Sequence, residues 1–319
     1  MKKIFVAGHN GMVGSALCRK IKLDTSISAV TQNRSNLNLT NQEQVHKFLK
    51  SERPDAVIIA AAKVGGIHAN KTYPAQFIYE NLQIQNNIIN SCHENDIQKI
   101  LFLGSSCIYP KNNNQPIKEK DLLSGKLEPT NESYAIAKIA GIKMCEAYNR
   151  QFGRDYRSVM PSNLYGEGDN FHYENSHVIP ALIRKFHDAK VNSYDSVSVW
   201  GSGVPKREFL HVDDMADACL HVLKLSKDKY MQLVESNQTH INIGSGQDIT
   251  IKNLAMIIAK IIKYNGEVIF DRSKPDGTLQ KLMCSKLINK SGWHPQISLE
   301  EGIKKTYAWF LDNDDYRTF

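Results

Sequence analysis

Tyr134 and Lys138 occur as Tyr-Ala-Ile-Ala-Lys, and Ser105 precedes them at the end of an expected strand. Residues four apart share one face of a helix, so the phenol and the ammonium should lie side by side. A phenol ordinarily has a pKa of about 10, and a neighbouring ammonium lowers it. The tyrosine can then exchange a proton with a carbonyl oxygen, while a serine hydroxyl hydrogen-bonds to the developing alkoxide. The three residues predict oxidoreduction at a carbonyl group.

The segment Gly8-His9-Asn10-Gly11-Met12-Val13-Gly14 directly follows the first expected strand and opens the first expected helix. Glycines there permit a tight turn and bring a diphosphate close to a helix N-terminus. The spacing G-x-x-G-x-x-G is typical of short-chain dehydrogenases. The segment therefore predicts a dinucleotide site, with a glycine-rich turn that holds no ligand as the alternative.

The end of the second expected strand distinguishes NAD from NADP. An NAD site usually has Asp or Glu there, about 20 residues after the glycines, to hold the ribose hydroxyls. This chain reads Val30-Thr31-Gln32-Asn33-Arg34-Ser35, without an acid. A guanidinium suits a 2′-phosphate because it is always charged and can donate two hydrogen bonds. Arg34 thus favours NADP, and a solvated surface arginine is the alternative.

The elements that must position these residues alternate regularly over the first half of the chain. Strands are predicted at Lys3–Ala7, Ser28–Thr31, Ala56–Ala61, Ile100–Gly104 and Arg157–Pro161, and helices at Met12–Ile21, Gln42–Ser51, Ala75–Glu94 and Ser133–Phe152. Such alternation implies an α/β fold: a doubly wound parallel sheet of the Rossmann type, with helices on both faces. Ligands should bind beyond the carboxyl ends of the strands.

The alternation loosens after residue 163. Helices are predicted at Val178–Asp188, Asp214–Leu225, Ile251–Ile262 and Leu299–Leu311, and short strands at Val197–Val199, Ile241–Ile243 and Glu267–Phe270. His211 is expected to be structural, ahead of a helix capped by Asp213 or Asp214. We predict a cofactor domain over residues 1–163, to which later segments return, and a smaller, mainly substrate-binding lobe over residues 164–319.

Composition narrows the class of protein. The net charge is +7, but Lys and Arg are spread evenly, which favours a basic enzyme with an anionic substrate over a nucleic-acid partner. The six cysteines are scattered, without C-x-x-C or a histidine cluster, so neither a disulfide framework nor a metal site is predicted. Apolar runs are too short for a signal peptide or a membrane span, so we expect a soluble, cytoplasmic protein.

Longer strings carry a resemblance that extends from about Lys3 to about Phe310. They are Ala7–Ser15, Ala61–Ile67, Leu103–Pro110, Glu128–Glu132, Tyr134–Gly141, Asn175–Pro180, Trp200–Gly203, Arg207–Asp214 and Lys274–Thr278. Through them the chain resembles the GDP-L-fucose synthase family, which are 3,5-epimerase/4-reductases of the extended short-chain dehydrogenase/reductase type.

The resemblance implies roles for individual residues. Ser105, Tyr134 and Lys138 match the reduction triad, and Cys107 and His177 match the acid/base pair of epimerisation. A thiol and an imidazole have pKa values suited to moving protons at the carbons beside the C4 ketone. Implied contacts to the GDP-linked sugar come from Ser106, Asn163, Lys185, Trp200, Arg207, Asp276 and Lys281. Implied contacts to NADPH come from Gly8–Gly14, Arg34, Ala61, Ala62, Lys63, Tyr134, Lys138, Pro161, Asn163, Leu164 and His177.

Three departures from the family pattern leave the substrate open. The family commonly has Arg at the positions of Asn10 and Lys185, and Arg-Lys-Leu-Leu-Asp where this chain has Gln280–Cys284. The last two lie in the nucleotide and sugar region. The alternatives are therefore a 3,5-epimerase/4-reductase of GDP-4-keto-6-deoxymannose and a C4 reductase of another GDP-4-keto sugar, such as a heptose, with little or no epimerisation. A non-catalytic NADPH-binding regulator is a third alternative, which the intact triad disfavours.

The resemblance also implies a homodimer. The predicted helices Ala75–Glu94 and Ser133–Phe152 carry apolar stripes that could form a four-helix bundle between two subunits, as the family does. Alternatively, both stripes only cover the sheet of their own chain.

Overall fold

The computed structural model describes residues 1–173, 176–235, 237–274 and 276–313, so Asn175 and Pro275 of the shared strings lie outside the described residues. Six parallel strands form the main sheet in the order β2-β1-β3-β4-β5-β9. Their bounds are Lys3–Ala7 (β1), Ser28–Val30 (β2), Ala56–Ile59 (β3), Lys99–Leu103 (β4), Asp155–Pro161 (β5) and His240–Ile243 (β9). The predicted doubly wound parallel sheet is confirmed.

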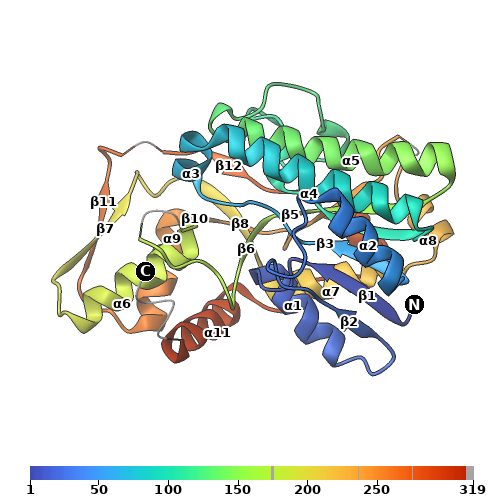
Figure 1. The fold of residues 1–319 in the computed structure, drawn as a ribbon. Coiled ribbons are helices and arrows are strands. Elements are labelled where there is room, and N and C mark those ends of the chain that lie inside the picture. The colour runs from blue at the N-terminus through green and yellow to red at the C-terminus, as the bar shows by residue number, and fades with distance from the viewer. Residues whose placement is uncertain (174–175, 236, 275, 314–319) are drawn as a thin grey trace.

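Helices cover both faces of this sheet (Figure 1). They are α1 (Met12–Lys22) and α7 (Val212–Lys224) on one face, and α2 (Gln42–Glu52), α4 (Pro74–Glu94) and α5 (Glu132–Phe152) on the other. Alternate residues of β1 serve the two layers: Ile4 and Val6 pack in the cluster of α1 and α7, whereas Phe5 and Ala7 pack in the cluster of α2 and α4. Successive side chains of a strand point to opposite faces, so a sheet covered twice requires uninterrupted apolar strands.

A second group of elements lies to the left in Figure 1 and has its own apolar core. It contains α6 (Val178–Val191), β7 (Ser196–Trp200), α9 (Ile251–Ile262), β11 (Glu267–Asp271) and α11 (Leu299–Asp312). Strands β7 and β11 pair in parallel. Each of these elements is predicted by the sequence within a few residues, because each has a clear apolar period.

A third, small sheet connects the two groups and is not predicted by the sequence. Its central strand β8 (Lys206–His211) pairs with β6 (Asn163–Tyr165), β10 (Asp248–Thr250) and β12 (Gln280–Lys281). The neighbours of β8 have only two or three residues, and β8 itself begins Lys-Arg-Glu. Such segments carry no apolar period that a sequence reading could detect.

Three short helices, α3 (Ile67–Thr72), α8 (Lys227–Leu233) and α10 (Lys286–Lys290), are likewise unpredicted. The expected cap of α7 is wrong, because His211 itself is the N-cap and its Nδ1 accepts a hydrogen bond from Asp213 N at 3.2 Å. In the described ranges, no helix combines the length and the apolar character that a bilayer crossing needs.

The strand order places the candidate residues at one edge of the main sheet. Strand β1 lies between β2 and β3, so the chain changes direction across the sheet beside β1. The carboxyl ends of parallel strands meet at one edge, and such a switch point is where open α/β sheets bind ligands. The segments that follow β1, β3, β4 and β5 carry the glycine turn, Ala61–Lys63, Ser105 and Asn163, respectively.

Candidate active site

The glycine turn after β1 is built for close backbone approach. Gly8 has φ of 89°, a conformation that side chains disfavour, and its carbonyl accepts a hydrogen bond from Gly11 N at 3.0 Å. A Cβ on Gly14 would lie 2.0 Å from Gly8 O, so no larger residue fits there. In the described chain, α1 has neither a side-chain cap nor an acid in its first turn. Its free N–H groups and positive dipole end suit a diphosphate.

The loops after β1 and β2 meet where the ribose of a dinucleotide would lie. Asn10 Nδ2 donates to Asn33 Oδ1 at 3.1 Å, next to Arg34. Arg34 is exposed and makes no hydrogen bond or ion pair within the described residues. Its guanidinium can therefore turn towards a 2′-phosphate, and the residues present fit NADP.

The remaining predicted cofactor residues lie along the same edge. Ala61 and Ala62 follow β3, Pro161 ends β5, and Leu164 lies in β6. Lys63 N donates to Asn81 Oδ1 at 2.9 Å, and its Nζ forms an ion pair with Glu80 at 2.6 Å. The Lys63 side chain is thus directed towards α4.

The predicted triad is assembled from the end of β4 and the first turns of α5. Lys138 is 3% exposed, and its Nζ donates to Leu103 O at 2.7 Å and lies 5.8 Å from the centroid of the Tyr134 ring. Ser105 hydrogen-bonds to Tyr134, and its Oγ also accepts from Cys107 N at 3.4 Å. The sequence spacing correctly predicts that these side chains come together.

The protonation states differ from those expected. Burial raises the pKa of Tyr134 far above its ordinary value, the nearby Cys107 raises it further, and the Ser105 hydrogen bond offsets this only in part. The predicted lowered pKa of Tyr134 is therefore wrong for this arrangement, because desolvation of the phenol, which disfavours the phenolate, is the dominant effect. Burial lowers the pKa of Lys138 to about 8. At neutral pH the phenol is a protonated donor and the lysine is mostly charged.

The Cys107 thiol lies within the same group. It is 9% exposed, in a 3-10 turn, Ser106–Ile108, directly after Ser105. Burial raises its pKa, while the charge of Lys281, a hydrogen bond with Ser105 and the charge of Lys138 act in the opposite direction. The structure thus places a thiol close to the predicted triad and to a lysine from β12.

His177 is placed separately. It is the residue before α6, its side chain retains access to solvent, and partial desolvation lowers the pKa of its imidazole. In the described part of the chain it makes no hydrogen bond or ion pair with Cys107 or Tyr134. Among the described residues, the two predicted epimerisation residues are therefore not joined by a hydrogen bond or an ion pair.

Beyond Cys107, the predicted sugar-nucleotide residues include the cations Lys281, Arg207 and Lys185, which we call the basic wall. Lys281 on β12 lies opposite Arg207 on β8, and the two cations are close enough that Arg207 lowers the pKa of Lys281, as burial does more strongly. Arg207 Nη1 also donates to Thr278 O at 2.6 Å. Asn163 Nδ2 donates to Glu208 O at 2.8 Å, which holds β6 against β8.

The far end of the wall surrounds an exposed tryptophan. The Trp200 ring is 64% exposed, with Lys185 Nζ 5.2 Å and Lys274 Nζ 5.6 Å from its centroid. Asp276 accepts hydrogen bonds from Ser202 N at 2.9 Å and Ser202 Oγ at 2.6 Å, and it attracts Arg207. The adjacent cations Arg207 and Lys281 can bind a diphosphate, and the exposed indole of Trp200 can stack on a base or a sugar.

Comparison with known proteins now adds to this geometry. Residues 4–244 match the NAD dependent epimerase/dehydratase family. The chain belongs to that family. GDP-L-fucose synthase of Escherichia coli K12 is 57% identical over 314 residues, which cover 98% of both chains. The predicted resemblance is thereby confirmed.

Solved structures of similar proteins have the same fold as this chain. A GDP-6-OMe-4-keto-L-xylo-heptose reductase from Campylobacter jejuni has a TM-score of 0.89 at 37% identity, covering 98% of both chains. A GDP-L-fucose synthetase from Naegleria fowleri bound to NADP has a TM-score of 0.86 at 27% identity, covering 98% of this chain and 95% of that one.

Some residues of the site were not predicted. Lys274 and Ser202 lie beside Trp200 and Asp276, and Glu208 lies beneath Arg207. All three belong to the strings that carry the resemblance, which is the signal that could have identified them.

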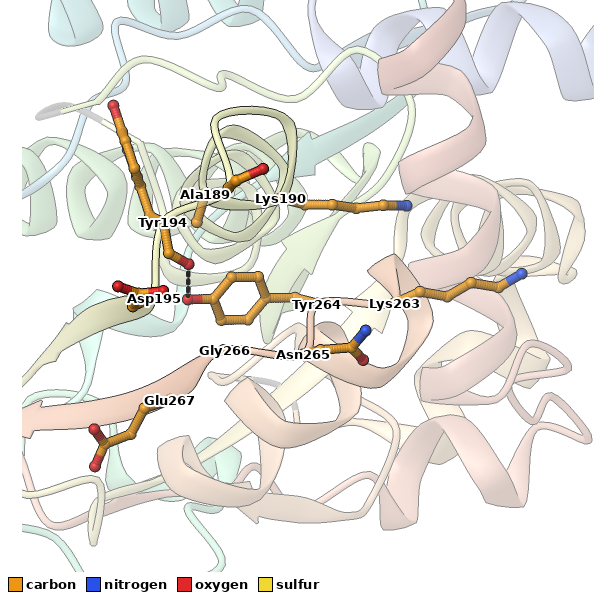
Figure 2. Close-up of a pocket in the computed structure, with 10 residues that line it drawn as sticks. Ala189, Lys190, Tyr194, Asp195, Lys263, Tyr264, Asn265, Gly266 and Glu267 are labelled. Carbon is orange, nitrogen blue, oxygen red and sulfur yellow. Dashed lines mark hydrogen bonds between the residues drawn. The ribbon is translucent and has the colours of Figure 1, made fainter.

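A cavity of about 510 Å³ lies elsewhere, between the ends of α6 and α9 (Figure 2). Tyr264 Oη donates there to Tyr194 O at 2.9 Å. None of the predicted site residues line this cavity, so it has no part in the site described above.

Proposed function

We propose that this protein converts GDP-4-keto-6-deoxy-D-mannose to GDP-L-fucose with NADPH, by epimerisation at C3 and C5 followed by reduction at C4. The observation that carries the proposal is the position of the Cys107 thiol against Ser105, Tyr134 and Lys138. A plain reductase needs no thiol there. The 57% identity to a GDP-L-fucose synthase supports the same function.

In the reduction, the protein stabilises charge on the C4 oxygen. Tyr134 is protonated at neutral pH and donates its proton to that oxygen, and Ser105 donates a hydrogen bond to it. The Lys138 ammonium then stabilises the phenolate that remains. Lys138 is buried and Tyr134 is half-buried, which limits the access of water to these steps and strengthens each interaction.

In the epimerisation, two groups exchange protons at the carbons that flank the ketone. Cys107 acts as one acid/base: burial raises the pKa of its thiol, and the charges of Lys281 and Lys138 offset part of that rise. His177 acts as the other, since its lowered pKa leaves the imidazole neutral and basic at pH 7. We place the substrate between the two residues, so that each reaches one of the carbons that flank the ketone.

NADP is held by the glycine turn Gly8–Gly14 at the N-terminus of α1, and by Arg34 at its 2′-phosphate. When bound, the nicotinamide supplies the hydride that reduces C4. The chain orients this group through the segments that follow β3, β4 and β5, which carry Ala61, Ser105 and Asn163.

We predict that Arg34→Ala lowers the preference for NADPH over NADH roughly ten- to a hundredfold, because a charge-assisted phosphate contact contributes about 1.5–3 kcal/mol. The measurement is kcat/KM for both cofactors. Arg150→Ala, which removes an exposed arginine from α5, serves as a matched control and should leave the ratio unchanged. Equal kcat/KM values for NADPH and NADH in the unmodified protein would contradict the NADP assignment.

A second candidate is a C4 reductase of a GDP-4-keto-heptose. It is favoured by the likeness to the heptose reductase and by Lys185 and Gln280–Cys284. The test compares NADPH oxidation with GDP-4-keto-6-deoxymannose and with GDP-4-keto-heptose. We expect a higher kcat/KM for the deoxymannose, and the opposite order would establish the heptose function instead.

We propose in addition that two copies associate through α4 and α5. These helices pack side by side on the outside of the molecule, and they expose Tyr79 (63%) and Ile136 (42%) (Figure 1). Light scattering should give twice the mass of the chain, and Ile136→Glu should give a monomer. A monomeric mass for the unmodified protein would contradict the proposal.

A further inference from the structure

Glu208 is a buried carboxylate immediately behind the basic wall. It lies on β8 between Arg207 and Phe209 and is 0% exposed. It forms no ion pair with any described residue. A carboxylate without a counter-ion is costly to bury unless its oxygens accept good hydrogen bonds. The segments that those hydrogen bonds hold therefore indicate the role of Glu208.

The two carboxylate oxygens bind two different segments. Oε1 accepts from Gly246 N at 2.7 Å, and Oε2 accepts from Met283 N at 2.9 Å. The turn after β9 is fitted against the carboxylate, because a Cβ on Gly244 would lie 2.2 Å from Oε1. Glu208 thus joins β8 to the Gly244–Gly246 turn and to the segment that follows β12.

That segment follows one of the predicted substrate residues. Met283 lies two residues after Lys281 of β12, and Lys281 pairs with Arg207 of the neighbouring strand β8. Strand β12 has only two residues, so few ladder hydrogen bonds fix it. Further support comes from Ile117, whose N donates to Leu282 O at 2.8 Å and whose O accepts from Cys284 N at 2.8 Å. The Glu208–Met283 bond extends the attachment of this segment to β8 beyond the two-residue ladder and the hydrogen bond from Lys206 N to Leu279 O at 2.8 Å.

On β8, the residue that supports β12 and the residue predicted to bind the ligand lie on opposite faces of the small sheet. Arg207 and Glu208 are consecutive, so their side chains point to opposite faces of the small sheet. The guanidinium is thus on one face, while the carboxylate fastens β12 from the other. Burial raises the pKa of Glu208 to about 7, so its two backbone hydrogen bonds, rather than a permanent charge, provide this support. Removing one of these bonds would loosen Lys281 relative to Arg207 without removing either cation.

We infer that Glu208 is a positioning residue of the sugar-nucleotide site, which sets the spacing of the Arg207 and Lys281 cations that bind the diphosphate of a GDP-linked ligand. The inference rests on the proposed function, because it takes both cations to be diphosphate ligands.

Asp214 offers a matched control. It is also buried, at 3% exposure, and its two carboxylate oxygens accept from Gln296 N at 3.1 Å and Ile297 N at 2.9 Å. It therefore fastens two backbone N–H groups as Glu208 does, but it holds the segment before α11 rather than β12. A merely structural role predicts the same behaviour for Glu208→Gln and Asp214→Asn.

The experiment measures the dissociation constants of GDP and of NADP by calorimetry, together with Tm, for both variants. An amide offers one acceptor oxygen, so Glu208→Gln loses one of its two backbone bonds. We expect its GDP dissociation constant to rise roughly tenfold, while that of NADP changes less than about twofold. With substrate, KM should rise while kcat stays nearly constant. Asp214→Asn should lower Tm comparably and leave GDP binding unchanged.

Two further variants separate the possible failures. If Arg207→Ala and Lys281→Ala bind GDP normally, the proposed sugar-nucleotide site is wrong. If they bind GDP weakly but Glu208→Gln binds it normally, only the inference about Glu208 is wrong. An equal loss of GDP affinity in Asp214→Asn would also overturn it. Should Glu208→Gln not fold, Glu208→Asp, which keeps the charge but cannot reach both N–H groups, is measured against the same expectations.

Discussion

Tyr134→Phe is expected to lower the rate of ketone reduction by about a hundredfold or more while NADPH still binds. The substitution removes the proton donor but almost no volume, so the packing against Phe77, whose ring lies 6.3 Å away, is retained. The raised pKa of Tyr134 makes the loss severe, because the protonated phenol is the form that reduction needs. Single-turnover oxidation of NADPH and a separate measurement of NADPH affinity check both parts.

Tyr148→Phe is the matched control for this result. Tyr148 lies on the same helix, and its hydroxyl donates to Asn90 Oδ1 at 2.8 Å, away from the carboxyl edge of the sheet. That variant should retain near-normal turnover. If Tyr134→Phe also turns over normally, the active site is not the one described here.

Cys107→Ser is expected to lose epimerisation far more than it loses reduction. A hydroxyl has too high a pKa to replace a thiol as a base, whereas the hydride machinery does not require residue 107. The measurement is mass spectrometry of the product formed in D2O from GDP-4-keto-6-deoxymannose and NADPH. The unmodified protein should place solvent deuterium at C3 and C5. The variant should place none, although it still consumes some NADPH.

Cys18→Ser tests whether this effect is specific. Cys18 is a half-buried cysteine on α1, and the other free cysteines among the described residues are buried. Its replacement should leave deuterium incorporation unchanged. If the unmodified protein reduces a GDP-4-keto sugar quickly with no deuterium at either carbon, the protein is a plain C4 reductase, and Cys107 and His177 do not act as acid/base groups.

The sequence by itself determined the main sheet, the glycine turn and the grouping of Ser105, Tyr134 and Lys138. Each depends on residues that are close in the chain: the apolar period of a strand or helix, three glycines in one turn, or a tyrosine and a lysine one helical turn apart. Local backbone geometry fixes how such residues lie relative to one another, so their spacing was sufficient. The strings that carry the resemblance then indicated which distant residues are expected to bind the sugar nucleotide.

Only the tertiary structure decided how those distant residues meet. The small sheet of β6, β8, β10 and β12 forms from segments too short and too polar to have a period of their own, and it places Lys281 beside Arg207 and Cys107. The protonation of Tyr134 was predicted wrongly from its spacing to Lys138, because desolvation depends on every atom packed around a group. The partners of Glu208 could not be predicted from the sequence either. Gly246 and Met283 lie 38 and 75 residues further along the chain and become its neighbours only in the folded protein.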